Sequence, residues 1–246
     1  MTRKVCLVTG VGGATGAAIS RRFAHDGYAV AMLARSRGRL KELEQEIAHS
    51  KAYVCDVSDL DALARTITEV RDDLGKPSVV VHNAVSATFG TFLETNPWEL
   101  ERNFRVNTTA LLHLARDLAP DMVAAGSGSI VVTGNTSSFR GVPNYTLFAP
   151  TKAAQRILAE SLARTLWPQR VHVGYVTIDG SIESPWLSEG GRKPPAWHPP
   201  PADWSKTRED WFVRPDAIAE EVYRIAHQDS SAWTFDIVIR PFAEKW

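Results

Sequence analysis

The segment Thr9-Gly10-Val11-Gly12-Gly13-Ala14-Thr15-Gly16 combines residue types and spacing that suit phosphate binding. It follows a short apolar run and leads into residues with helical spacing. A glycine-rich turn at such a junction lets backbone N–H groups and a helix N-terminus face a pyrophosphate. A strict G-x-G-x-x-G is absent, because Thr15 stands five residues after Gly10. We therefore predict a phosphate-binding turn, the alternative being an ordinary tight turn between strand and helix.

A basic cluster follows the second apolar run. It contains no Asp or Glu, and its polar members are Arg35, Ser36, Arg37, Arg39 and Lys41. Proteins that bind NAD place an acidic residue near the end of the second strand, where it accepts from the ribose 2′-OH. Guanidinium groups instead suit bidentate contact with a 2′-phosphate. The cluster therefore predicts NADP(H) rather than NAD, with Arg35 and Ser36 as the contacts. The alternative is a solvated helix start.

Seven apolar, β-branched runs supply the strands that would position these groups. They are residues 4–9, 30–34, 52–56, 78–82, 129–133, 171–178 and 233–239. Most are continuously apolar rather than alternating, which is typical of strands buried on both faces of a parallel sheet.

Helical spacing fills the gaps between these runs. Residues 39–47 place Leu40, Leu43 and Ile47 on one face, and residues 59–70 and 216–226 show the same pattern. Strands that alternate with such helices predict an α/β fold, a Rossmann-like doubly wound parallel sheet of about seven strands with helices on both faces. No linker or internal repeat interrupts the pattern, so residues 1–246 are expected to form a single dinucleotide-binding domain.

Composition excludes several classes of function. The 246 residues include 28 basic and 28 acidic side chains, and this zero net charge gives no reason to expect a nucleic-acid partner. No apolar stretch is long enough to span a membrane, and the run before Thr9 is too short for a signal peptide. Cys6 and Cys55 form neither a disulfide framework nor a metal-ligand spacing. We expect a cytoplasmic protein without a metal site.

Taken together, these motifs resemble the short-chain dehydrogenase/reductase family over essentially the whole chain. The family's T-G-x-x-x-G-x-G is matched by Thr9, Gly10 and Gly16, with Ala14 at its middle glycine. His82-Asn83-Ala84-Val85 is similar to the family's N-N-A-G, and Asp56-Val57 to its adenine-contacting Asp. The resemblance implies that Asn83, Ala84, Asp56 and Val57 take part in cofactor binding.

The family's catalytic residues are only half present. The resemblance implies roles for Asn107, which matches the family's helix Asn, and for Lys152, which matches the Lys that holds the nicotinamide ribose. Phe148 stands where the proton-transferring Tyr is expected, and Asn135 stands at the Ser position, from which its amide can still donate to a carbonyl. An alternative alignment places Ser138 there, only ten residues before Phe148.

A substitute acid must then be sought near the same face. Asp179 follows the sixth apolar run, where the carboxyl ends of strands line the site, and it is our first candidate. The other candidates are Tyr145, Ser137, Ser138, Glu183 and His198. In the family the loop after Asp179 also binds the nicotinamide amide, which implies contacts from Ile182 and Ser184. The chain is similar to a divergent bacterial subgroup of the family that lacks the usual Ser and Tyr.

Residues 183–214 hold an unusual concentration of Trp and Pro. Four of the eight tryptophans, Trp186, Trp197, Trp204 and Trp211, lie there. The family uses this region as a substrate lid, so we expect either an aromatic wall over an apolar or aromatic substrate, or tryptophans that fix the lid or a subunit contact. The family's members are commonly homodimers or homotetramers.

Three hypotheses follow for the function. The first is an NADP(H)-dependent oxidoreductase that acts on a carbonyl/alcohol pair or an activated double bond through an atypical proton donor. The second is a non-catalytic NADP(H)-binding protein or sensor, which Phe148 and Asn135 favour. The third is a lyase or isomerase, which Ala14 favours weakly.

Overall fold

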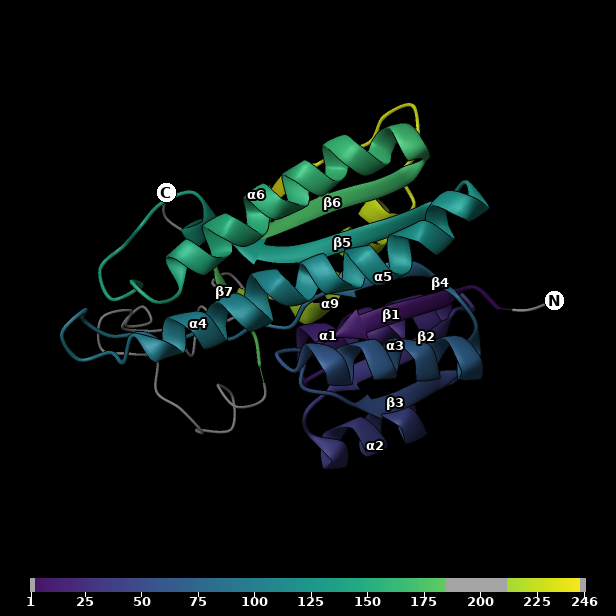
Figure 1. The fold of residues 1–246 in the computed structure, drawn as a ribbon, viewed down its shortest axis with the longest axis horizontal. Helices are drawn as coiled ribbons and strands as arrows, with labels where there is room; N and C mark the ends of the chain where they lie inside the picture. Colours follow the sequence, from purple (N-terminus) through teal and green to yellow (C-terminus); the bar gives the residue numbers. More distant parts are fainter. Residues whose placement is uncertain (1–2, 185–211, 244–246) are drawn as a thin grey trace.

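The computed structural model describes residues 3–184 and 212–243. Seven parallel strands form one sheet in the order β3-β2-β1-β4-β5-β6-β9 (Figure 1). The strands are β1 (Val5–Thr9), β2 (Ala29–Ala34), β3 (Ser50–Val54), β4 (Pro77–His82), β5 (Gly128–Asn135), β6 (Val171–Ile178) and β9 (Asp236–Ile239). The predicted doubly wound sheet is confirmed, and so is its strand number.

Helices cover both faces of this sheet. One face packs against α3 (Leu60–Leu74), α5 (Ala110–Ala125) and α6 (Ala149–Leu166), and the other against α1 (Thr15–His25), α2 (Arg37–Glu46) and α9 (Pro215–Ala226). Figure 1 shows α5 and α6 in front, with α1 and α9 behind. Two hydrophobic cores result, which explains why the strands are apolar on both faces.

Short elements surround the carboxyl ends of the strands. They are α4 (Trp98–Phe104), the π-helical turn η1 (Arg105–Thr109) and the 3₁₀ turn η2 (Thr136–Ser138), whereas the 3₁₀ turn η3 (Trp167–Gln169) lies at the opposite edge, before β6. A separate two-stranded ladder pairs β7 (Ser181–Ile182) with β8 (Phe212–Val213). The four tryptophans of the expected lid lie outside the described residues.

The strand order reverses between β1 and β4. From β1 the chain adds β2 and then β3 on one side, and it then adds β4, β5, β6 and β9 on the other side. Ligands of open α/β sheets bind at this switch point, beside the carboxyl ends of the strands. The topology thus brings the turns after β1, β4, β5 and β6 together, and these turns carry most of the candidate residues.

Candidate active site

Two glycines of the turn after β1 lie very close to neighbouring backbone atoms. Gly10 has φ +69°, and a Cβ on it would lie 2.5 Å from the Ala84 Cα; a Cβ on Gly16 would lie 2.6 Å from the Gly10 carbonyl oxygen. Neither position can accept a larger side chain without movement of the backbone. Gly12 has open space around it and Gly13 is exposed. The outer part of the turn is therefore open to a ligand.

The N-terminus of α1 is suited to an anion. No side chain caps the helix, and its first turn contains no acidic residue. Ala14 precedes the helix at φ −118° and ψ −114°. The first N–H groups of the helix point toward the open turn and favour a negative charge.

Thr9 and Asn83 lock this turn to the next strand along the sheet. The Thr9 hydroxyl oxygen accepts from the backbone N–H groups of Asn83 and Ala84, each at 3.2 Å. The Asn83 amide donates to the Gly10 carbonyl at 3.0 Å and accepts from the Thr133 hydroxyl at 3.1 Å. These predicted cofactor residues thus act on the shape of the turn through their own hydrogen bonds.

Basic groups gather at the ends of β2 and β3. Arg35 and Ser36 are exposed, and Ser36 does not cap α2 with its hydroxyl. Burial opposes ionisation of Asp56, but hydrogen bonds from Ser58 and the charges of Arg35 and Arg102 outweigh it and lower the pKa of the Asp56 carboxyl. Val57 beside it is buried. A hydrogen-bonding carboxylate and a guanidinium therefore share this end of the site.

Lys152 lies in the first turns of α6 and is only 3% exposed. Its ammonium donates to the Thr133 carbonyl at 3.1 Å. Burial lowers the pKa of Lys152 to about 7. Since Thr133 also bonds Asn83, a continuous line of hydrogen bonds joins the glycine turn to this buried cation. An ammonium has three donors, so it keeps capacity for a ligand.

Asn107 lies in η1 and is fully buried. Its side chain donates to the Ser86 carbonyl and the Thr151 hydroxyl, both at 2.8 Å, and accepts from the Ser86 N–H at 2.9 Å. All of these partners belong to the protein. In this structure the predicted catalytic Asn107 holds the loop after β4 against α6.

A buried histidine connects Asn107 to the glycine turn. His82 Nδ1 lies 3.1 Å from the Thr9 hydroxyl, and Nε2 lies 3.2 Å from the Asn107 carbonyl. Burial and the charge of Lys152 lower the pKa of His82 to about 4, so the ring is neutral. Nε2 must then donate to the carbonyl, while Nδ1 accepts from Thr9. Gln155 donates to the same carbonyl at 2.7 Å.

Aromatic rings occupy the place of the usual proton donor. Phe148 is 4% exposed, and its ring centroid lies 5.3 Å from that of Phe89 and 6.0 Å from that of Tyr145. Tyr145 lies in the turn before α6 rather than on the helix itself. Burial raises the pKa of the Tyr145 phenol.

Tyr145 and Ala153 belong to the wall of a cavity of about 470 Å³ next to η2. Ser137, Ser138 and Phe139 line its other side. Apolar groups predominate, and hydroxyls and one guanidinium, from Arg140, supply the polar contacts. A small organic substrate fits a cavity of this size.

Asn135 and Asp179 lie at the carboxyl ends of the neighbouring strands β5 and β6. The Asn135 side-chain oxygen accepts from the Ser137 N–H at 3.2 Å, which leaves its amide N–H groups for a ligand. The two Asp179 carboxylate oxygens accept from the Thr136 hydroxyl at 3.1 Å and pair with Arg240 at 3.0 Å. Asp179, our first candidate for the acid, is therefore held in an ion pair.

Ile182 and Ser184 follow Asp179 around the site. Ile182 pairs with Val213 in the small ladder, and the buried Ser184 hydroxyl has no hydrogen-bond partner within residues 3–184 and 212–243. A buried hydroxyl without a partner is costly unless a ligand satisfies it. This orphaned hydroxyl, the uncapped α1 and the buried ammonium fit a nicotinamide dinucleotide. His198 lies outside the described residues.

Sequence reasoning missed four residues that build the site. His82, Thr133, Thr151 and Gln155 carry its internal hydrogen bonds. His82 and Thr133 could have been found from the sequence, because each is a polar residue inside an otherwise apolar strand.

No helix among the described residues is both long and apolar enough to cross a membrane. No group of His, Cys, Asp or Glu among them could hold a metal ion.

Comparison with known proteins places this geometry among relatives. A family model described as short chain dehydrogenase matches residues 4–189. D-erythrulose reductase from Gallus gallus is 30% identical over 171 residues, which cover 69% of this chain and 68% of that protein. A metagenomic short-chain oxidoreductase solved with NADP is 26% identical, with a TM-score of 0.80 and 98% of each chain covered. An alcohol dehydrogenase from Thermococcus sibiricus, complexed with 5-hydroxy-NADP, is 25% identical, with a TM-score of 0.83 and 99% and 98% covered.

Proposed function

Because the chain belongs to the short chain dehydrogenase family of oxidoreductases, we propose that it is an NADP(H)-dependent enzyme that acts on a carbonyl/alcohol pair or an activated double bond. One observation carries the proposal. The hydrogen bonds from Gly10 through Asn83 and Thr133 to Lys152 join a phosphate-binding turn to a buried cation at the reacting end. When bound, the dinucleotide supplies or accepts the hydride.

The chain's own residues bind and orient the two reactants. Gly12, Gly13 and the α1 N-terminus bind the pyrophosphate, and Lys152 holds the nicotinamide ribose. Arg35 and Ser36 take the 2′-phosphate, which is why we expect NADP(H) to be preferred. The support for this preference is the exposed guanidinium beside Asp56 and the NADP or NADP analogue in the two solved relatives.

Tyr145 is the proposed proton donor. Its raised pKa keeps the phenol protonated at neutral pH, and it lines the cavity beside α6. Asp179 is less suited because Thr136 and Arg240 already engage its carboxylate. The Asn135 amide, at the end of β5 just before η2, orients the substrate carbonyl.

The substrate is proposed to be a small molecule with an apolar or aromatic part. The apolar groups of the cavity beside Tyr145 support this choice. The relative from Gallus gallus is named as a reductase of D-erythrulose, which supports a carbonyl as the reacting group.

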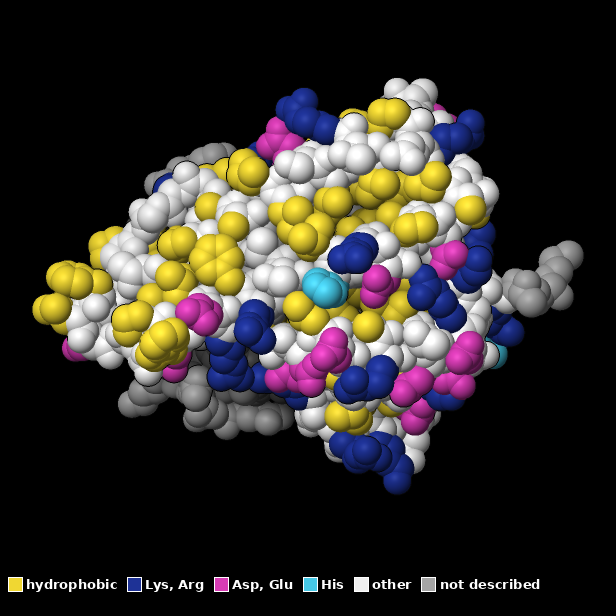
Figure 2. All heavy atoms as spheres, in the orientation of Figure 1, with side chains coloured by type: hydrophobic (Ala, Val, Ile, Leu, Met, Phe, Trp, Pro, Cys, Tyr) yellow, Lys and Arg dark blue, Asp and Glu magenta, His cyan; other side chains and the backbone are white. Residues whose placement is uncertain are grey.

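A homo-oligomer is the proposed assembly. Figure 2 shows hydrophobic side chains gathered over the face that α5 and α6 present, where Leu112 and Ile157 are exposed. Light scattering on the purified chain tests this, and a monomer at micromolar concentration would contradict it.

The test of function is an NADPH-oxidation screen over aldehydes, ketones and enones with aromatic or aliphatic substituents, together with calorimetric titration of NADPH and NADH. We expect turnover with at least one carbonyl class and tighter binding of NADPH than of NADH. Tight NADPH binding without turnover on any substrate would contradict the proposal and favour a non-catalytic NADP(H)-binding protein. Product formation without net NADPH consumption would leave the lyase or isomerase.

A further inference from the structure

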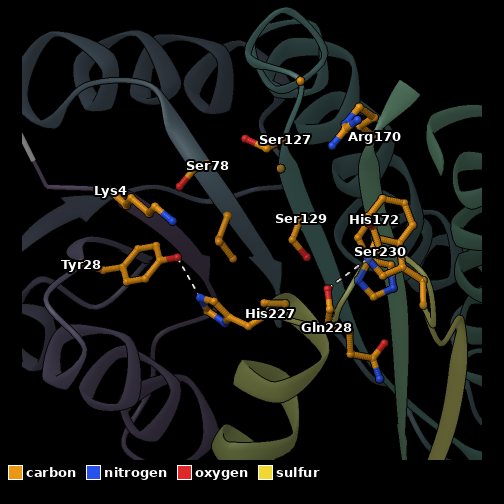
Figure 3. Close-up of a pocket in the computed structure, with 15 residues that line it drawn as sticks. Lys4, Tyr28, Ser78, Ser127, Ser129, Arg170, His172, His227, Gln228 and Ser230 are labelled. Atoms are coloured by element: carbon orange, nitrogen blue, oxygen red, sulfur yellow. Dashed lines mark hydrogen bonds between the residues drawn. The ribbon is translucent and has the colours of Figure 1, made fainter. Parts of the chain in front are cut away.

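A second cavity lies at the opposite edge of the sheet from the glycine turn. Its volume is about 230 Å³, and it is walled by the residues at which β1, β4, β5 and β6 begin and by the end of α9 (Figure 3). In a parallel sheet the amino ends of the strands lie away from the carboxyl ends. The cavity therefore shares no lining residue with the proposed active site, and it is too small for a dinucleotide.

Two buried polar side chains in its wall each carry one atom that has no hydrogen-bond partner among the residues that the structure describes. Ser129 and His172 are each 2% exposed and face each other across the β5–β6 ladder. The Ser129 hydroxyl and His172 Nδ1 are both unpartnered. Leaving such atoms unsatisfied costs about 1–3 kcal/mol each, which is the usual sign of a missing ligand or water.

The tautomer of His172 follows from its other nitrogen. Nε2 lies 3.0 Å from the Thr234 carbonyl and must donate to it. Burial lowers the pKa of His172, although the Thr234 and Ile225 carbonyls oppose the shift, so the ring is neutral. Nδ1 then carries a lone pair and needs a donor. The stacked ring of Trp233, 4.8 Å from the imidazole, fixes this orientation.

Two cations flank the same cavity. Lys4 and Arg170 lie on opposite sides of Ser129 in Figure 3, and neither makes an ion pair within residues 3–184 and 212–243. No carboxylate is among the residues that line the cavity. Arg170 has φ +65°, a conformation that favours glycine and costs a residue with a Cβ about 1 kcal/mol. A guanidinium is thus present at a position where the backbone alone would select glycine.

We propose that this cavity binds a small oxyanion that also carries a hydroxyl, either hydrogen phosphate or a small phosphomonoester. Lys4 and Arg170 neutralise the charge, the Ser129 hydroxyl donates to an anionic oxygen, and the ligand's own hydroxyl donates to His172 Nδ1. Sulfate has the same shape as phosphate but carries no hydroxyl at neutral pH, so it satisfies only the first two requirements. This inference is independent of the proposed function, since it uses none of the same residues.

The test is calorimetric titration of the full chain with inorganic phosphate, sulfate and glycerol phosphate, repeated with NADPH present. Phosphate should bind at least about tenfold more tightly than sulfate, and NADPH should not displace it. Comparison of phosphate with glycerol phosphate distinguishes the two sources of the ligand. Displacement of phosphate by NADPH would instead assign it to the glycine turn and overturn the proposal.

Two variants locate the bound anion. Arg170→Gly removes the cation where the backbone already suits glycine, so the fold should remain and phosphate affinity should fall by about tenfold. Ser129→Ala removes one donor without adding volume and should weaken phosphate severalfold. Arg65→Gln, which removes an exposed positive charge outside the lining residues, is the control. Unchanged phosphate affinity in both cavity variants, or equal affinity for sulfate and phosphate, would overturn the proposal.

Discussion

The two ends of the proposed active site are built on different principles. Around Gly10 the backbone itself forms the binding surface, and Thr9 and Asn83 satisfy three of its polar groups through their side chains. Around Phe148 the wall consists of packed aromatic rings, and the polar groups stand at its margins.

The difference explains why one end keeps its pattern while the other departs from it. Phosphate binding uses many backbone N–H groups, so it does not depend on any single side chain. Proton transfer uses one atom at one position, so replacement of that side chain forces another group to act. Substitutions at each of the two ends test this contrast.

Gly10→Ala should distort the glycine turn and strongly destabilise the fold. The added Cβ meets the Ala84 backbone at 2.5 Å in a left-handed conformation, and strain plus overpacking should cost ~3 kcal/mol or more. Gly12→Ala is the matched control, because nothing lies within 4 Å of its Cβ. Denaturant unfolding measures both variants. Equal stabilities would show that the turn is not shaped by this close approach.

Lys152→Met should remove the cation that both ends share. Turnover should fall by roughly 10²–10⁴-fold if this ammonium positions the reactants. A hydrogen-exchange or near-UV spectrum that matches the parent would show that the fold is kept. Turnover within tenfold of the parent would show that the Lys152 ammonium does not position the reactants.

The same variant should change how stability depends on pH. The folded pKa of Lys152 is about 7 and its ordinary value is 10.5, so the unfolded chain binds an extra proton between these values. The penalty for burying the charge is therefore fully present below pH 7 and decreases as pH rises. The free energy of unfolding should increase from pH 7 to 10 by at most about 1.4 kcal/mol per pH unit. Urea unfolding across this range should lose that slope in Lys152→Met.

Tyr145→Phe should lower turnover without changing cofactor binding. Loss of a positioned acid lowers turnover by about 100-fold, while NADPH affinity stays unchanged. Asp179→Asn, in the carboxylate paired with Arg240, should lower turnover less than tenfold. The reverse order of effects in steady-state kinetics would reinstate Asp179 as the acid.

Arg35→Ala should have the smallest effect. One charge-assisted contact to the 2′-phosphate corresponds to about tenfold in NADPH affinity, with NADH affinity unchanged. Arg39→Ala is the control in the same segment, since Arg39 already pairs with Glu42 at 2.9 Å. If calorimetry shows an equal loss of affinity for NADPH and NADH, Arg35 does not determine which of the two cofactors is preferred.

Hydrophobic pattern predicted the fold well because continuous apolar runs and helical spacing are local properties. The strand near residues 52–56 begins and ends two residues earlier than expected, as Ser50 and Lys51 join the ladder with β2 despite their polarity. The last strand was predicted from Trp233 but begins at Asp236, because Trp233 packs on His172 instead.

The candidate site was predictable where it depends on motif position and unpredictable where it depends on contacts. Lys152 and Asn83 lie at the expected edge of the sheet. The full use of the Asn107 side chain by Ser86 and Thr151 could not be predicted, because those partners come from separate elements. The Asp179–Arg240 pair likewise forms only when β6 and β9 are adjacent.

The neutral His82 between Thr9 and Asn107 carries a consequence for how this protein can change. A substitution on either side forces the imidazole to swap tautomer or to lose a partner, so the effect of a second substitution depends on the first. Thr9→Val and Gln155→Leu should therefore show strong epistasis in a double-mutant cycle, although Thr9 ends β1 and Gln155 lies in α6.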